Sequence, residues 1–349
     1  MGLPEILIEF KAAASTAVSR SGNGIAALIL RDKSNETLSY SYPKEASVVK
    51  SHWTASSLDM INKTFLGGPS RVLVERIGTE DTYDAALERL THKKWNYLAI
   101  PDLAEDDVKG IADWIIAQRG DKKTFKAVLP NYAANHEGII NFATDGIQVG
   151  TKAYTTAQYC ARMAGVLAGT PLNASCTYAV LPEVTAITES TDPDGDIDAG
   201  KLILINDGEN IKIGRGVNSL SAMTGNKTED MKKIKIVDGM DLIRDDIRNS
   251  FENNYIGIAN SYDNKQLFVN AVGVYLSGLV RSGVLYDAYD NKAFIDLDAQ
   301  RAWLEQKDAA WAEKSDNEIK AANTGSYVFA GCDVKFQDAI EDLRFSIMM

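Results

Sequence analysis

The chain has only three histidines, His52, His92 and His136, from which a proton-relay site could be built. A serine hydrolase needs one of them beside an exposed nucleophile, and the Gly-x-Ser-x-Gly signature of a nucleophile elbow does not occur. His92 stands in the charged segment Thr91–Lys94 at the end of a predicted helix, where a role against the helix dipole is more common than catalysis. His136 precedes a glutamate, but no second histidine follows at helical spacing, so the zinc-protease pattern fails. We therefore predict no catalytic residue.

Glycine-rich and acidic segments also fail as ligand-binding motifs. Gly22–Ala27 imitates a dinucleotide fingerprint, but it leads into a strand, whereas the fingerprint follows a strand and opens a helix. Gly208–Gly214 lacks the Lys-Ser/Thr pair of a phosphate loop. Asp192–Asp198 alternates acidic residues as a calcium loop does, but Ile197 and Ile203 stand where an EF-hand needs glycine and a carboxylate. The sequence predicts no cofactor and no metal site.

Composition excludes several classes of partner. The 349 residues are 45% hydrophobic and 24% charged, an ordinary globular balance, and the net charge of -11 argues against direct binding of nucleic acid. Cys160, Cys176 and Cys332 form no CxxC pair, which predicts reduced, mostly buried thiols and cytoplasmic assembly. No signal peptide is visible, and the longest apolar stretch, Ala271–Val280, is interrupted by Ser277 and too short to span a bilayer. We expect no direct membrane insertion.

Short apolar runs alternate with helical stripes from residue 24 to residue 129. The runs predict strands and the stripes predict helices. The predicted strands are 24–30, 71–77, 95–100 and 125–129, and the predicted helices are 55–65, 82–90 and 105–118. This alternation is typical of an α/β fold, a mostly parallel sheet flanked by helices, which residues 139–142, 154–167 and 178–181 extend.

The pattern changes after Thr185. A polar turn at Asp192–Asp198 marks a boundary, and a hairpin is expected around Asp207 and Gly208. Further on, the sequence predicts three helices: an amphipathic one over 242–255, one buried on most sides over 266–280, and a surface helix marked by Leu297, Leu304 and Trp311. Two strands are expected after them, over 326–330 and 334–336. We divide the chain into an extended arm (1–23), an α/β domain (24–190), an α+β domain (191–332) and a strand arm (333–349).

Both ends of the chain carry an alternating pattern that has no local partner. The apolar faces are Ile6, Ile8 and Phe10 at one end and Leu343, Phe345 and Ile347 at the other. No hairpin turn adjoins either strand, so each must pair far away in its own chain or with another chain. Two such strands on one molecule could link a subunit to two neighbours. The strand pattern alone therefore makes polymer formation a hypothesis, before any sequence motif is considered.

One motif has no function that the residues alone assign. Gly214–Leu220 follows a predicted strand and places Arg215 between two glycines. By residue type it indicates a bend where one backbone approaches another.

Four segments together resemble the tail sheath proteins of contractile-tailed bacteriophages and the related phage-tail-like bacteriocins. They are Gly2–Phe10 with the Ala-rich Lys11–Ser21 after it, Gly214–Leu220, Ile234–Arg248, and Asp333–Ile347. The resemblance covers most of the chain, and the short length is similar to that of the compact diffocin type of bacteriocin.

The resemblance implies a subtilisin-like core that carries no catalysis, because fold alone does not confer chemistry. It also implies subunits that stack as hexameric rings around a tail tube and contract to drive the tube through a target cell envelope. Terminal arms would add strands to sheets in neighbouring subunits, with the two apolar faces named above as the donated ones.

The implied partners are further copies of the chain, the tail tube protein, and baseplate and tail terminator proteins. The implied location is a virion tail or bacteriocin particle assembled in the host cytoplasm. A charged helix is expected to face the tube, and its candidate residues are Asp241, Arg244, Asp245 and Arg248.

Three alternatives stay open at this point. The chain could be an α/β hydrolase-like enzyme with an unrecognised active site. It could be a tube or baseplate protein, although the strand–helix alternation argues against the small β-barrel of a tube. Both terminal strands could also pair inside their own subunit.

Overall fold

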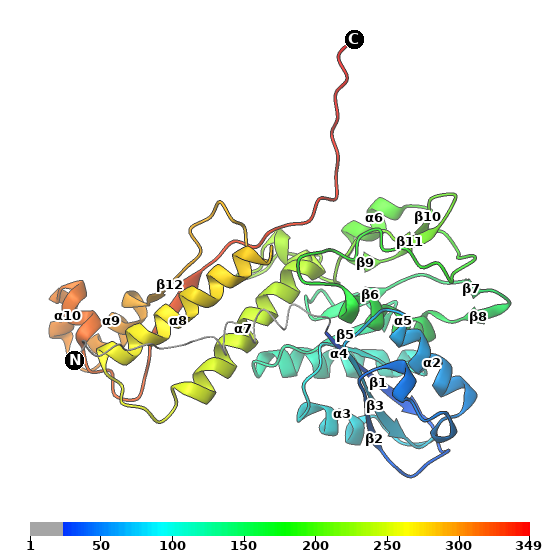
Figure 1. Ribbon diagram of the computed structural model, residues 1–349, viewed down its shortest axis with the longest axis horizontal. Coiled ribbons are helices and arrows are strands. Elements are labelled where there is room, and N and C mark those ends of the chain that lie inside the picture. The colour runs from blue at the N-terminus through cyan, green and yellow to red at the C-terminus, as the bar shows by residue number, and fades with distance from the viewer. Residues whose placement is uncertain (1–23) are drawn as a thin grey trace, which may run out of the picture. The chain divides into compact units, whose positions relative to one another are not determined.

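A computed structural model describes residues 24–349 of the chain (Figure 1). These residues divide into two compact units. We call residues 24–238 together with 339–349 the sheet unit, and residues 239–338 the helical unit. The predicted N-terminal strand, with Ile6, Ile8 and Phe10, lies outside the described residues.

The two units divide at a different point from the predicted domains. The predicted boundary after residue 190 falls inside the sheet unit. The chain first leaves that unit between Asp238 and Gly239, within a single helix, and returns to it at Ala339. No loop marks the first of these crossings, because α7 runs through it.

The sheet unit is built on one mostly parallel sheet, as predicted. Among the described residues seven strands take the order β2-β3-β1-β4-β5-β6-β9, and only the β2–β3 pair is antiparallel. The strands are β1 (Ile25–Arg31), β2 (Ser39–Tyr42), β3 (Arg71–Ile77), β4 (Tyr97–Ala99), β5 (Lys126–Pro130), β6 (Ile139–Phe142) and β9 (Lys201–Leu202). The interior of β1 is buried on both faces, as the unbroken apolar run Ala26–Leu30 requires.

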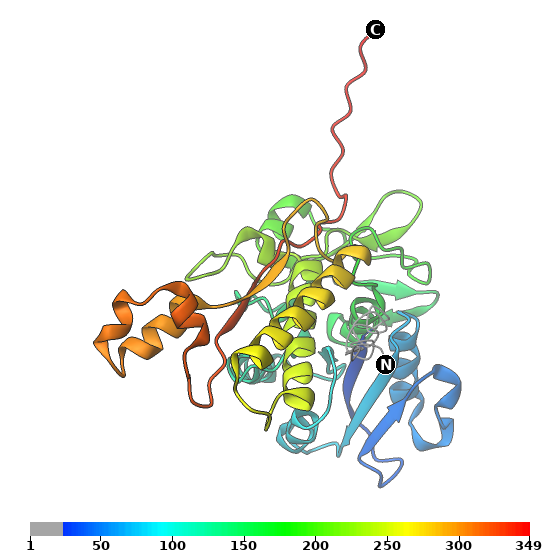
Figure 2. The same ribbon diagram turned by 60° about the vertical axis from the view of Figure 1, so that its left-hand side comes forward.

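Helices cover both faces of this sheet (Figures 1 and 2). One face carries α2 (Ala55–Phe65) and α5 (Thr156–Gly169), and the other carries α3 (Asp84–Thr91) and α4 (Glu105–Gly120). Local chemistry fixes where the helices begin. The Thr54 side chain accepts from the Ser57 amide, and Thr155 and Gln158 form a capping box at the start of α5.

The remaining elements of the sheet unit are small. They are the hairpin β7 (Ile147–Val149) and β8 (Lys152–Tyr154), the hairpin β10 (Leu204–Asn206) and β11 (Ile211–Ile213), the helix α6 (Pro193–Asp198), and the 3-10 turns Glu45–Ser47, Lys50–His52 and Glu229–Lys232. The hairpin around Asp207 and Gly208 is confirmed, and Gly208 takes the positive φ of 94° that its turn needs.

Two predictions for this unit were wrong. Residues 178–181 do not extend the main sheet, because their backbone bonds instead to β11 of the small hairpin, with an isolated bridge between Val180 and Lys212. The polar turn at Asp192–Asp198 is a short helix, since the Asp192 side chain accepts from the Gly195 amide and caps it.

The helical unit pairs two long helices with a small sheet. Its elements are α7 (Ile234–Asn254, from Gly239 onward), α8 (Tyr262–Arg281), β12 (Lys292–Ile295), α9 (Leu297–Glu305), the 3-10 turn Ala309–Glu313, α10 (Asp316–Ala321) and β13 (Ala330–Asp333). The Phe268 ring of α8 meets two rings edge to face, that of Phe251 in α7 and that of Tyr255 just after α7. The helices α7 and α8 lie side by side in Figure 2.

The helix over 266–280 is confirmed, and so is its burial on most sides, since only Asn270, Val274 and Ser277 of these residues are exposed. Two other expectations for the helical unit need correction. The helix predicted to run through Trp311 ends at Glu305, and Trp311 lies in the separate 3-10 turn Ala309–Glu313. The strands expected at 326–330 and 334–336 are replaced by β13, which lies between them and pairs with β12.

The contact between α2 and α5 gives a test of the packing in the sheet unit. A Cβ atom on Gly165 would overlap the main-chain carbonyl of Thr64, so Gly165→Ala should lower the free energy of unfolding by about 1–3 kcal/mol. The matched control is Gly110→Ala on the exposed side of α4, where nothing lies within 4 Å of the new methyl group. It should stabilise by about 0.5–1 kcal/mol through helix propensity. Urea midpoints of the full chain measure both, and equal midpoints would contradict the close approach.

Candidate functional site

The C-terminal tail offers the most exposed apolar surface of the described chain. Leu343, Phe345 and Ile347 are 84%, 76% and 77% exposed. Their segment is not a strand here, and no described residue forms a hydrogen bond or ion pair with Leu343–Met349. Among residues 24–349 this end therefore has no paired strand within its own subunit.

The residues just before this tail are held firmly within the sheet unit. The Arg215 guanidinium lies 2.6 Å from an Asp342 carboxylate oxygen (Nη2 to Oδ1) and 3.6 Å from Glu341 (Nε to Oε2). The hydroxyl oxygens of Ser175 and Thr177 lie 2.9 and 2.6 Å from Glu341 Oε1. The Glu341 side chain is only 8% exposed, whereas that of Asp342 is 79% exposed. The chain thus changes from anchored to free at residue 342.

The helical unit contains a small sheet with open edges. β12 and β13 pair only with each other among the described strands. Phe294, 39% exposed, lies opposite Gly331, where a Cβ would come within 3.0 Å of its ring. Each strand presents main-chain donors and acceptors along its outer edge that a further strand could use.

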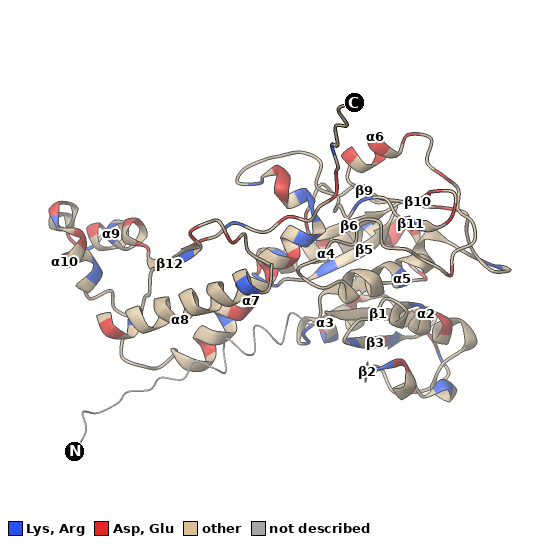
Figure 3. Cartoon of the chain, turned by 45° about the horizontal axis from the view of Figure 1, so that its top comes forward, with Lys and Arg blue, Asp and Glu red and all other residues tan. Residues whose placement is uncertain are grey.

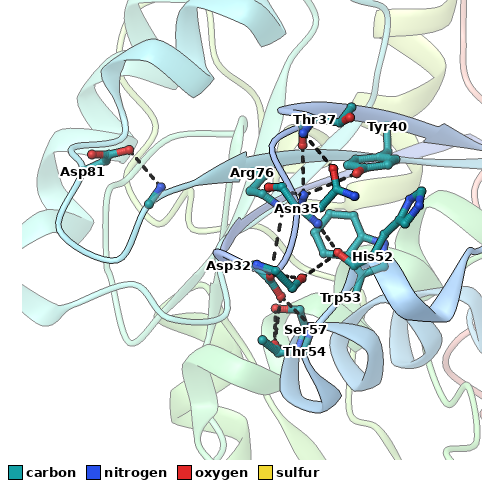
Figure 4. A network of polar contacts seen from close by, with 12 residues as sticks. Asp32, Asn35, Thr37, Tyr40, His52, Trp53, Thr54, Ser57, Arg76 and Asp81 are labelled. Carbon is teal, nitrogen blue, oxygen red and sulfur yellow. Dashed lines mark hydrogen bonds and ion pairs between the residues drawn. The ribbon is translucent and has the colours of Figure 1, made fainter.

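One cluster of Asp, His and Ser side chains resembles a catalytic set by composition (Figure 4). Asp32 directly follows β1, and its carboxylate accepts from the Ser34 hydroxyl and from the main-chain amide and hydroxyl of Thr54. The Ser34 hydroxyl also donates to His52, but to its main-chain carbonyl and not to its ring. No serine–imidazole–carboxylate relay is assembled by these groups.

This cluster instead ties the loop after β1 to the start of α2. Arg76 completes it, since its guanidinium stacks 4.2 Å above the Trp53 ring centroid and donates to the carbonyls of Asn35 and Thr37. Burial acts to raise the pKa of Asp32, but the hydrogen bonds that its carboxylate accepts outweigh burial and hold the pKa well below its usual range. The carboxylate is a structural anion.

Other residues singled out in the sequence have structural partners. Burial raises the pKa of the Cys176 thiol to about 12 and raises that of Cys160 as well, so both are neutral thiols at physiological pH. Asp196 pairs with Lys201. Within the described residues no group of three or more His, Cys, Asp or Glu side chains could hold a metal ion, and no helix is long and apolar enough to cross a membrane.

The four candidate tube-facing residues lie on α7, where acidic and basic side chains alternate (Figure 3). Asp241 is buried, with 4% of its surface exposed. Asp245 and Arg248 are half-buried, and Arg244 is exposed. Contact with a tube stays a prediction, and Arg244 is the member of the set best placed to make it.

Comparison with known proteins identifies the chain. The description "phage tail sheath protein central domain" matches residues 77–219, and "phage tail sheath C-terminal domain" matches residues 226–349. The tail sheath protein of Clostridium phage phiCD119 is 36% identical over 360 residues, covering 100% of this chain and 99% of that protein.

Solved structures share the fold at low sequence identity. A sheath tail protein from Listeria innocua superposes with a TM-score of 0.69 at 16% identity, over 96% of this chain and 100% of that one. A chain of the anti-feeding prophage baseplate gives a TM-score of 0.71 at 13% identity, over 100% and 99% of the two chains.

These matches define a structural protein of a contractile tail, not an enzyme. The chain belongs to the phage tail sheath protein family, as the resemblance of its four segments predicted. The α/β hydrolase-like alternative is thereby set aside.

The Asp32 cluster yields a pH-dependent prediction. Because the pKa of Asp32 is lowered by folding, its stabilisation is present above the unfolded-state pKa of about 3.9 and is lost as pH falls through the folded-state value. Asp32→Asn should therefore cost about 2 kcal/mol of unfolding free energy at pH 7, the cost of hydrogen bonds to a charged group. The deficit should shrink below pH of about 4.

Thermal unfolding at pH 7, 5 and 3 measures this difference. Asp113→Asn is the control, since Asp113 forms an exposed ion pair with Lys109 on α4. Such an exposed pair contributes little to stability, because solvent and salt screen it. An Asp32→Asn deficit that grew toward low pH would contradict the structural role of the carboxylate.

Proposed function

We propose that this chain is the repeating subunit of a contractile sheath, in which stacked hexameric rings surround a tail tube and contract to drive it through a cell envelope. Membership of the tail sheath family supports this proposal most directly. A further support is that similar folds occur in the anti-feeding prophage baseplate, including one in its contracted state. Contraction needs no nucleotide, because its energy comes from a change in the contacts between subunits.

Strand donation links the subunits in this proposal. The tail from Leu343 onward supplies a donated strand, since its apolar side chains alternate and are exposed, with no partner among the described residues of their own subunit. The sheet of β12 and β13 in another copy is the acceptor, because its outer edges are unpaired among the described strands. Main-chain hydrogen bonds would hold the added strand, and its alternate side chains would select the register. Ile6, Ile8 and Phe10 are proposed as a second donated face.

The remaining partners follow from the family. We assign the tail tube protein to the inner surface, with Arg244 of α7 as the leading contact, and baseplate and tail terminator proteins to the two ends of the sheath. The particle is a virion tail or a bacteriocin assembled in the host cytoplasm. The parallel sheet with helices on both faces is compatible with the subtilisin-like core that the resemblance implies, and the arms at 1–23 and 333–349 complete the proposed organisation.

The alternation of the tail provides the test. Replacing Leu343, Phe345 and Ile347 together by serine should abolish hollow cylinders in negative-stain electron microscopy and leave slowly sedimenting subunits. The matched control replaces the opposite face, by Arg344→Ser, Ser346→Ala and Met348→Ser. Cylinders should persist in the control, because the apolar face of the donated strand is intact.

Truncation of residues 1–20 tests the second arm in the same assay, and loss of cylinders is expected. Cylinders that survive the triple serine replacement would overturn donation by the C-terminal tail. A wild-type chain that stays unassembled with tube protein present would overturn the sheath function itself.

A further inference from the structure

Almost every residue of the Gly214–Leu220 motif is buried within the sheet unit. The motif is buried from end to end except for Arg215. The Asn218 side chain donates to the carbonyl of Met231, and the Ser219 hydroxyl donates to the carbonyl of His136. These bonds fix the loop against segments far away in the sequence, so the bend that the two glycines indicated is a rigid one.

Arg215 is the exception, because its side chain leaves the loop and its ion pairs within residues 24–349 are with the end of the chain. This side chain is 34% exposed, and its guanidinium meets the carboxylates of Glu341 and Asp342, which lie 126 and 127 residues further along the chain. Two adjacent carboxylates around one guanidinium give a charge-assisted contact that a lysine would match less well.

The loop around Cys176 completes the other side of this contact. Thr177 Oγ1 accepts from the Gly216 amide at 2.9 Å and donates to Glu341 at 2.6 Å, so it connects the motif to the tail directly. A side chain at residue 216 would place its Cβ 2.8 Å from the Cys176 sulfur. Gly216 is therefore required for the two loops to approach and hold Glu341 between them.

We propose that Arg215, Ser175 and Thr177 form a clasp that fixes the root of the C-terminal arm, with Arg215 as its positioning residue. This inference rests on the proposed function, since the arm matters only if it is donated. The clasp leaves the seven residues 343–349 free, a reach of about 23 Å when extended.

Fixing the root has two physical consequences for donation. A short anchored tail loses less conformational entropy on joining a neighbour than a longer free one would. In an assembled sheath any pull on the arm passes through the clasp into the rigid sheet unit. Arg215 thus connects the link between subunits to the body that must move during contraction.

Carboxypeptidase digestion of the unassembled full chain, followed by mass spectrometry, tests the clasp. In the wild type, trimming should slow sharply once residues 343–349 are gone, because Asp342 and Glu341 are held. In Arg215→Glu, release of Glu341 should be at least about tenfold faster, the effect of losing one hydrogen bond to a charged group. The two proteins share one tail sequence, so the preferences of the enzyme cancel.

Three further variants keep the result interpretable. Glu341→Gln with Asp342→Asn weakens the clasp from the tail side and leaves Arg215 and the loop of Ser175 and Thr177 unchanged in sequence, and should also speed trimming beyond residue 342. Arg215→Lys should give an intermediate rate. Arg71→Glu, an equal charge change at an exposed position of β3, should leave the wild-type stopping point unchanged.

An identical stopping point in wild type, Arg215→Glu and the tail variant would overturn the clasp. This outcome is separate from failure of the sheath proposal, because digestion is read on single subunits and assembly is read by microscopy. If both proposals hold, Arg215→Glu subunits should form fewer and shorter cylinders than Arg71→Glu subunits.

Discussion

The main-chain N–H and C=O groups along the edge of a strand need hydrogen-bond partners, and the rest of the structure depends on where each strand finds them. In the sheet unit, β1 finds them on both sides, because it lies between β3 and β4, and its interior is buried on both faces. The outer edges of β12 and β13, and the C-terminal tail, have no such partner among the described strands of the same chain. In the proposed assembly a second copy supplies the missing neighbour of each strand.

Buried ion pairs help to fix the arrangement of the sheet unit. Glu75 at the centre of β3 is fully buried, yet its carboxylate is paired with both Arg89 and Lys93 and accepts from the Ser39 hydroxyl. Such a group is costly when unpaired, so the surrounding elements are held to one arrangement. The start of α7 also belongs to the sheet unit, and its Asp238 pairs with the buried Lys126.

The sequence predicted the parts whose pattern is local. Strand β3 and helix α2 have the predicted bounds, because their apolar periodicity is strong. Strand β2, of sequence Ser-Tyr-Ser-Tyr, and the two-residue β9 carry too weak a pattern to be found. The apolar face of the tail was visible in its alternation, but the role of Arg215 was not, since its carboxylate partners lie more than 120 residues away in the sequence.

The most direct test of strand donation is a disulfide between two copies. The donor copy carries one new cysteine in its tail, by Phe345→Cys, Leu343→Cys or Ile347→Cys, and its own Cys332 is removed by Cys332→Ala. The acceptor copy either keeps Cys332 of β13 or carries Lys292→Cys in β12. Paired strands bring Cα atoms within the 4.4–6.8 Å that a disulfide spans. Strand donation predicts a disulfide-linked dimer after mild oxidation of assembled cylinders, and no linked dimer from unassembled subunits. Well-formed cylinders that yield no linked dimer for any of these pairs would contradict it.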